Sequence, residues 1–261
     1  MKGIILAAGQ GTRLKKYTEN LPKGMLKING KTIIERQIEI YRKCGIDKII
    51  VVRGYAADKI NYDGIKYYEN IDYENTNMVE SLLAAKAEFD DDTIVSYSDI
   101  IFTEKMLKTM MDNKDDFACA VDENWKEYWN MRYGSIDFDT ESLELNQDDT
   151  IRELGLENPP LEKIDARYVG LLKFSKNGLN EIVAIMKDAH ERYENKPWQQ
   201  SGKIVQKAYM TDLLNAVIES GKSIRAVKFN NGWIEFDTND DYETVIKWSE
   251  SGDLIKLGIK L

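Results

Sequence analysis

The strongest constraint on the fold is the alternation of short apolar runs with helical segments over the first 121 residues. The apolar runs have the length of buried strands and lie at residues 2–6, 48–52, 65–68, 93–97 and 117–121. The helical segments between them lie at residues 32–42, 56–60, 78–89 and 104–112. Strands that alternate with helices form parallel βαβ units with right-handed crossovers. The sequence therefore predicts an α/β fold with a Rossmann-like, mixed but mostly parallel sheet flanked by helices.

The first strand leads directly into a loop that contains Gly9 and Gly11. Glycine has no Cβ and tolerates positive φ, so the N–H groups of such a loop can form an anion-binding nest. Arg13 and Lys23 place two positive charges beside it. The loop matches the dinucleotide-binding pattern only in part, because the second strand ends in Arg53 where that motif has a carboxylate. A plain turn is the structural alternative, but a triphosphate fits the pattern better.

The alternation breaks between residues 122 and 166, a charged segment that also contains Trp125, Tyr128, Trp129 and Tyr133. Short strands are expected there at residues 133–137 and 143–145. Strands at 168–174 and 223–229, helices at 179–193, 208–220 and 240–248, and a polar loop at 196–203 then follow. We expect one domain over residues 1–261, in which residues 122–166 form an insertion over the carboxyl edge of the sheet.

Composition excludes several functional classes. The formal net charge of −9 argues against nucleic-acid binding, which depends on Lys and Arg that neutralise phosphates. Two cysteines far apart in sequence, Cys44 and Cys119, are typical of a reducing compartment. No apolar run has membrane-spanning length and no signal peptide is evident, so we expect a cytoplasmic protein without a membrane partner. The oligomeric state stays open, a homo-oligomer included. The only histidine, His190, lies on the apolar face of a predicted helix and is expected to pack there.

The start of the chain resembles the N-terminal motif of the nucleotidyltransferases that activate sugar phosphates and phosphoalcohols. The matching segments are residues 6–13, Pro22-Lys23 and residues 25–31. Three departures favour the branch that makes CDP-linked small molecules, such as phosphocholine and 2-aminoethylphosphonate cytidylyltransferases. The sugar branch usually has two glycines where this chain has Ala8-Gly9. It also usually has a proline where this chain has Lys15, and another where it has Gly24. Later segments also resemble the CDP branch, namely residues 45–55, 77–82, 98–99 and 233–238. The resemblance thus spans nearly the whole chain.

The resemblance implies a magnesium-dependent cytidylyltransferase that converts CTP and a phosphorylated small molecule into a CDP-linked product and pyrophosphate. The acceptor would be of the phosphocholine, aminoethylphosphonate or phospho-amino acid or amide type, such as phosphoglutamine, and the product a precursor of cell-surface polysaccharide. Two alternatives remain: a sugar-1-phosphate nucleotidyltransferase that uses UTP or dTTP, and a non-catalytic nucleotide-sensing subunit. Arg13, Lys23, Asp99 and Asp237 are all retained, which argues against a sensor.

The implied site residues fall into groups. Arg13 and Lys23 would be catalytic, because they can neutralise charge at the α-phosphate. The nucleotide would contact Leu6, Ala8, Gly9, Gly11, Thr12, Asn77 and Ser81, the last two beside the pyrimidine and ribose. Asp99 and Asp237 would hold one Mg²⁺, which prefers carboxylate and phosphate oxygens. The structural alternative for Asp99 is an N-cap of the following helix. Without metal, we expect the two carboxylates to repel and one to have a raised pKa.

The acceptor side is expected in the aromatic segment. Aromatic faces and carboxylates together can hold an ammonium group. We therefore expect Trp125, Trp129, Tyr168 and Glu235 to bind the acceptor, with at least one of the three aromatic side chains facing the glycine loop across the crevice. Glu235 is also the alternative metal ligand if Asp237 points away.

Overall fold

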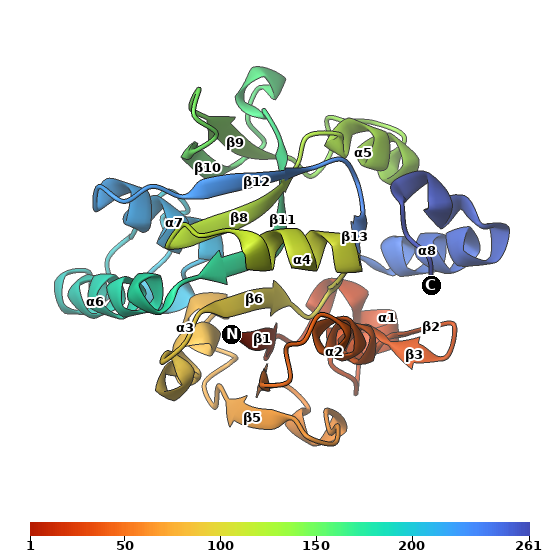
Figure 1. Cartoon of the computed structure of the whole chain (residues 1–261), viewed down its shortest axis with the longest axis horizontal. Helices are drawn as coiled ribbons and strands as arrows, with labels where there is room; N and C mark the ends of the chain where they lie inside the picture. The colour runs from red at the N-terminus through yellow and green to blue at the C-terminus, as the bar shows by residue number, and fades with distance from the viewer.

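The computed structural model describes residues 1–261. Its centre is a seven-stranded sheet with the order β12-β8-β11-β6-β1-β4-β5, drawn across the middle of Figure 1. The strands are β1 (Lys2–Ala7), β4 (Ile49–Arg53), β5 (Lys66–Glu69), β6 (Thr93–Tyr97), β8 (Phe117–Asp122), β11 (Arg167–Phe174) and β12 (Arg225–Phe229). β11 is antiparallel to both of its neighbours, and the other pairs are parallel. The predicted mixed, mostly parallel sheet is confirmed.

Helices cover both faces of this sheet. Side chains of successive strand residues point to opposite faces, so Ile5 packs in one core and Ile4 in the other. The core around Ile5 includes α2 (Ile33–Lys43), α4 (Glu104–Asp112), α5 (Trp125–Tyr133) and α8 (Asn239–Ser251). The core around Ile4 includes α3 (Met78–Ala84), α6 (Lys176–Arg192) and α7 (Met210–Glu219). Thr32 and Glu35 form a reciprocal capping box at the start of α2.

Smaller elements complete the chain. Three two-stranded sheets pair β2 (Lys27–Ile28) with β3 (Lys31–Thr32), β7 (Ile100–Phe102) with β13 (Trp233–Glu235), and β9 (Glu141–Leu145) with β10 (Ile151–Glu157). A short helix α1 covers Lys15–Thr18, and 3-10 turns cover Thr12–Leu14, Lys23–Met25, Ala57–Lys59, Lys86–Glu88, Leu161–Lys163, Val205–Lys207 and Asp253–Leu257. No helix in the chain combines the length and the apolar composition that crossing a membrane requires.

The segment between β8 and β11 differs from expectation. Residues 133–137 are not a strand: Tyr133 is the last residue of α5, and Gly134 ends the helix at φ +70°. The helical spacing is present in the sequence, at residues 125, 128, 129, 132 and 133. Four of these five residues are aromatic, however, and aromatic residues are typical of strands. The strand expected at 143–145 is part of β9. The hairpin β9–β10 and α5 lie beyond the sheet at the top of Figure 1.

Candidate active site

The loop after β1 is fixed by the ends of two neighbouring strands. The N–H of Tyr55 donates to the carbonyl of Ala8 at 3.0 Å, and the N–H of Ser98 donates to the carbonyl of Leu6 at 3.1 Å. Gly11 has φ +65°, and a Cβ there would lie 3.2 Å from the Cβ of Lys23. Glycine at position 11 therefore allows both the left-handed turn and the close approach of Lys23.

Lys23 stands between two carboxylates. Its Nζ lies 2.7 Å from Oδ2 of Asp99 and 2.7 Å from Oδ1 of Asp237, and Arg13 Nη2 lies 3.0 Å from the same Asp237 oxygen. Burial acts against the charged form of Lys23, but the two carboxylates outweigh it and raise the pKa of this ammonium. Burial also acts against the charge on Asp237, yet Lys23 and Arg13 lower the pKa of that carboxyl. The expected repulsion with a raised pKa is therefore wrong for Asp237, because a buried cation bridges the pair.

The small sheet β7–β13 brings these two aspartates together. Asp99 precedes β7 and Asp237 follows β13, and the antiparallel register pairs Glu235 with Ile100. The N–H of Phe236 donates to the carbonyl of Asp99 at 3.0 Å. Asp99 is not the N-cap of α4, since Thr103 occupies that position. Both aspartates therefore lie at the same edge of the main sheet, as the sequence predicted.

Two cavities open on this edge and share a wall formed by Lys23, Met78, Tyr97 and Asp99. The first cavity is lined by the loop after β1 and the start of α3; its further residues are Leu6, Ala8, Gly9, Gly11, Asn70, Tyr73, Thr76, Asn77, Ser81 and Ser98. The second lies towards the β9–β10 hairpin and α7; its further residues are Arg13, Asp139, Thr140, Glu141, Glu157, Asn158, Arg167, Tyr168, Tyr209, Met210, Thr211, Glu235 and Asp237.

Among the predicted nucleotide residues, only Thr12 lies outside both cavities: it is exposed in the 3-10 turn after the loop. Asn77 caps α3, because its Oδ1 accepts from the N–H of Met78 at 2.9 Å. The hydroxyl of Ser81 accepts from Nδ2 of Asn70 at 3.0 Å. Asn70 was not predicted from the sequence, although it directly follows β5 at the same sheet edge as the loop.

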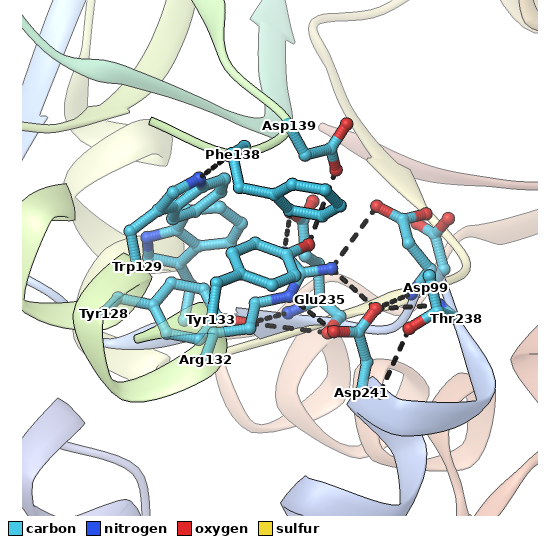
Figure 2. A network of polar contacts seen from close by, with 12 residues as sticks. Asp99, Tyr128, Trp129, Arg132, Tyr133, Phe138, Asp139, Glu235, Thr238 and Asp241 are labelled. Atoms are coloured by element: carbon cyan, nitrogen blue, oxygen red, sulfur yellow. Dashed lines mark hydrogen bonds and ion pairs between the residues drawn. The ribbon is translucent and has the colours of Figure 1, made fainter. Parts of the chain in front are cut away.

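Arg132 holds the carboxylates behind Lys23, a role that was not predicted from the sequence. Its side chain is 2% exposed; Nε and Nη2 donate to the two carboxylate oxygens of Asp241, each at 2.7 Å. Nη1 pairs with Glu235, and Nη2 lies 3.6 Å from Asp237 Oδ2. Figure 2 shows the guanidinium beside the rings of Tyr128, Trp129 and Tyr133 and facing Glu235 and Asp241. The N–H of Asp237 donates to Oδ2 of Asp241 at 3.0 Å, so helix α5 holds Asp237 in place through Arg132 and Asp241.

Two of the predicted acceptor residues are placed elsewhere. Trp125 and Trp129 are 1% and 0% exposed, and the indole N–H of Trp129 donates to the carbonyl of Phe138 at 2.8 Å. They pack in the core, so the prediction that they bind the acceptor is wrong: helix α5, which was not predicted, buries their large apolar area. Tyr168 does line the second cavity, and its hydroxyl donates to that of Tyr97 at 2.9 Å.

Glu235 lines the second cavity as well. Burial raises the pKa of Glu235 to about 7, although the positive charge of Arg132 acts in the opposite direction. The alternative in which Glu235 replaces Asp237 as a metal ligand does not arise, because Asp237 already points towards Lys23 and Asp99.

The donor set fits a metal that keeps part of its water shell. No group of three or more carboxylate, histidine or cysteine side chains could cage a metal ion. Asp99 and Asp237, however, lie on either side of the Lys23 ammonium, and each keeps one carboxylate oxygen, Oδ1 of Asp99 and Oδ2 of Asp237, that accepts no hydrogen bond from Lys23. Two carboxylate oxygens completed by phosphate oxygens and water suit Mg²⁺.

Comparison with known proteins agrees with this geometry. Residues 3–160 match the family described as MobA-like NTP transferase domain. The chain is 34% identical over 260 residues to the CTP:phosphoglutamine cytidylyltransferase of Campylobacter jejuni, with 95% of this chain and 100% of that protein covered. It is 33% identical over 138 residues to the choline-phosphate cytidylyltransferase of Streptococcus pneumoniae, with 51% of this chain and 59% of that protein covered.

Two solved structures share the fold. The CTP:phosphocholine cytidylyltransferase of Streptococcus pneumoniae superposes with a TM-score of 0.72 at 23% identity, over 94% of this chain and 97% of that one. The inositol-1-phosphate CTP transferase of T. maritima superposes with a TM-score of 0.68 at 18% identity, over 95% and 96%.

Proposed function

Because the chain belongs to the MobA-like NTP transferase family, we propose that it is a magnesium-dependent cytidylyltransferase. CTP and a phosphorylated small molecule give a CDP-linked product and pyrophosphate. The observation that carries the proposal is the pair of cavities that meet at Lys23 and Asp99. One cavity can take the nucleotide beside the glycine loop, and the other can take the acceptor, so the two reacting groups would meet at the shared wall.

The chemistry asks for alignment and positive charge rather than for a base. An oxygen of the acceptor's phosphate attacks the α-phosphorus of CTP, the bond between the α-phosphorus and the bridging oxygen breaks, and pyrophosphate leaves. A phosphate monoester has its second pKa near 6 and is largely dianionic at neutral pH, so no side chain has to remove a proton. Holding the attacking oxygen in line converts a bimolecular step into an effectively unimolecular one.

Each charged residue at the shared wall has a distinct task. Lys23 and Arg13 supply fixed positive charge where negative charge moves from the α-phosphate to the leaving group. Asp99 and Asp237 would hold Mg²⁺, which when bound neutralises triphosphate oxygens. Arg132 keeps Asp237 oriented from behind. The cysteines are free, as in a reducing compartment, and we place the reaction in the cytoplasm as a step towards a cell-surface polysaccharide precursor.

The proposal is tested by measuring pyrophosphate release with Mg²⁺, each of the four ribonucleoside triphosphates and dTTP, and a panel of phosphorylated acceptors. We expect turnover with CTP to exceed that with each other nucleotide by at least about tenfold. CTP at a hundred times its Kd should also stabilise the fold by about 2.7 kcal/mol. Preference for UTP or dTTP with a sugar 1-phosphate would favour the sugar-activating alternative, and binding without turnover would favour the sensor.

A further inference from the structure

The second cavity contains an arginine whose guanidinium forms no hydrogen bond and no ion pair within the chain. Arg167 begins β11 and is 8% exposed. Its guanidinium lies over the ring of Trp129 at 4.4 Å, and its Nη1 is buried without a hydrogen-bond partner. Because β11 runs antiparallel to β8, the register pairs Arg167 with Asp122, the last residue of β8. The start of β11 therefore lies at the same sheet edge as the catalytic residues.

An unpaired buried guanidinium is costly, and the neighbouring Arg132 shows the contrast. Arg132 is paired with Glu235 and Asp241, whereas no carboxylate lies within ion-pair distance of Arg167. A buried charge without a counter-charge costs several kcal/mol relative to its hydrated state. An unpaired guanidinium on the wall of a cavity can bind an anionic group of the ligand that fills the cavity.

The same cavity also has an acidic side. Asp139, Glu141 and Glu157 line it together with Arg167. No lysine or arginine lies within ion-pair distance of the Glu141 carboxylate, and burial raises its pKa although the positive charge of Arg167 acts in the opposite direction. A ligand that brought only a negative charge would leave this acidic side uncompensated. A ligand that brings both a carboxylate and an ammonium satisfies both sides.

We propose, on the premise that the chain is a cytidylyltransferase, that its acceptor is a phosphorylated compound with a free α-amino-acid group, whose carboxylate binds Arg167 and whose ammonium binds Glu141 and Glu157. Arg167 belongs to the second cavity only, whereas Lys23 lies on the wall where the phosphate must react. The anion at Arg167 is therefore a second one, distinct from the reacting phosphate. Arginine binds a carboxylate through two parallel hydrogen bonds, which adds geometric specificity.

Phosphocholine fits this cavity poorly. It carries no carboxylate, so Arg167 would stay buried and unpaired. Its quaternary ammonium cannot donate hydrogen bonds to carboxylates, and the two tryptophans that would favour it are buried in the core. A site built to hydrogen-bond a substrate group rejects analogues that lack the group by large factors.

The test compares matched acceptors in the presence of CTP and Mg²⁺. O-phosphoserine and O-phosphohomoserine carry both groups; phosphoethanolamine and 3-aminopropyl phosphate are the same molecules without the carboxylate; 3-phosphoglycerate replaces the ammonium of phosphoserine by a hydroxyl. We expect kcat/KM for the better amino acid to exceed that of its decarboxylated analogue by about a hundredfold or more. Equal values at both chain lengths, or a preference for phosphocholine, would overturn the proposal. Absence of CTP turnover with every acceptor, phosphocholine included, would overturn the proposed function instead.

Variants assign the two groups to their residues. Arg167→Gln should raise KM for the phospho-amino acid at least about thirtyfold, abolish discrimination against its decarboxylated analogue, and leave KM for CTP unchanged; Arg167→Lys should recover part of the loss. Glu141→Gln should weaken the binding of phosphoserine and of phosphoethanolamine to a similar extent, seen as a higher KM for each. It should leave KM for 3-phosphoglycerate unchanged. Arg152→Gln is the matched control, because this exposed arginine of β10 pairs with Glu144 outside the cavity.

Two outcomes for Arg167→Gln would contradict the assignment. An equal loss with phosphoserine and phosphoethanolamine would mean that Arg167 binds the reacting phosphate. A large fall in Tm with unchanged discrimination would mean that Arg167 is structural. A ligand-binding arginine without a partner in the chain predicts Tm within a few degrees of wild type.

Discussion

At the scale of single residues, the site depends on the position of one ammonium group. Lys23 contacts both Asp99 and Asp237, and its side chain is mostly buried. It thereby bridges two carboxylates that would otherwise repel each other, and it presents a positive charge to both cavities. Gly11 contributes because a Cβ at this position would lie 3.2 Å from the Cβ of Lys23, and because its φ of +65° favours glycine.

Replacing the two loop cations tests this arrangement. Lys23→Ala should lower kcat by a factor on the order of 10² to 10³ and change KM for CTP less, because charge moves during transfer and not during binding. Arg13→Lys should also lower kcat, since an ammonium cannot reproduce the two parallel hydrogen bonds that a guanidinium donates to a phosphate. The measurement is steady-state pyrophosphate release, with the exposed Lys16→Ala as control. Near-normal kcat in both loop variants would show that the loop does not act on the phosphates.

Asp99→Asn separates catalysis from folding. The variant keeps the size of the side chain and its hydrogen bond from Lys23, so we expect a Tm close to that of wild type. We expect turnover to fall about a hundredfold or more, equivalent to about 2.7 kcal/mol of barrier, and Mg²⁺ to bind more weakly by titration calorimetry with CTP present. Asp58→Asn, at an exposed position that lines neither cavity, should change neither quantity. Unchanged Mg²⁺ affinity would remove Asp99 from the metal site.

At the scale of elements, two small units complete what the sheet begins. The β7–β13 pair joins segments from distant parts of the chain and so places Asp99 beside Asp237. Helix α5 then supports Asp237 through Arg132, whose guanidinium faces Glu235 and Asp241 in Figure 2. The sequence allowed prediction of the aspartates from their positions after strand-like runs. It did not allow prediction of Arg132, because the aromatic residues of α5 have strand propensity, and burial decided the helix instead.

Removing the arginine of α5 should destabilise the whole chain. Arg132→Met leaves Glu235, Asp237 and Asp241 buried around an apolar side chain. Because removing one partner of a buried ion pair leaves an uncompensated charge, we expect the free energy of unfolding to fall by about 3–5 kcal/mol. Urea unfolding should report this as a lower midpoint with an unchanged m-value. The control Arg192→Met removes an exposed pair with Asp188 on α6 and should change stability by less than about 0.5 kcal/mol. Equal stability of the two variants would contradict the role given to Arg132.

At the scale of the whole molecule, the order of the strands decides where chemistry can occur. β1, β4 and β6 are parallel neighbours, so the loops after them meet at one edge, and antiparallel β11 brings its first residues there. The alternation of strands and helices was enough to predict a mostly parallel sheet and a shared crevice at its carboxyl edge. Arg167 could not be predicted, since nothing in the sequence tells that a strand-initial arginine lacks a partner; that follows only from tertiary packing.

The opposite edge of the sheet should contribute an acid-sensitive part of the stability. Glu88 accepts hydrogen bonds from Lys2 at 2.8 Å, from Tyr68 at 2.6 Å and from Lys66, and these bonds lower its pKa from 4.5 to about 2. A lowered carboxyl pKa stabilises the fold above pH 4.5, and that stabilisation is lost as the pH falls towards 2. Glu88→Gln should therefore be less stable than wild type by about 1–3 kcal/mol at pH 7, with the difference shrinking below pH 4.5.

Urea unfolding at several pH values measures this difference. The exposed Glu250→Gln serves as the matched control and should follow wild type at every pH. A stability difference between wild type and Glu88→Gln that stayed constant from pH 7 to pH 2.5 would show that the carboxylate charge of Glu88 is not its source.

The central claim is that the acceptor's phosphate attacks the α-phosphorus of CTP where the two cavities meet. It is tested most directly with an acceptor whose three non-bridging phosphate oxygens are ¹⁸O, turned over with CTP and Mg²⁺ and analysed by mass spectrometry and ³¹P NMR. The account predicts that all three labelled oxygens appear in the CDP-linked product, one of them in the new bridge, and that the pyrophosphate released carries none. Label in the pyrophosphate, or CMP as the only nucleotide product, would contradict it.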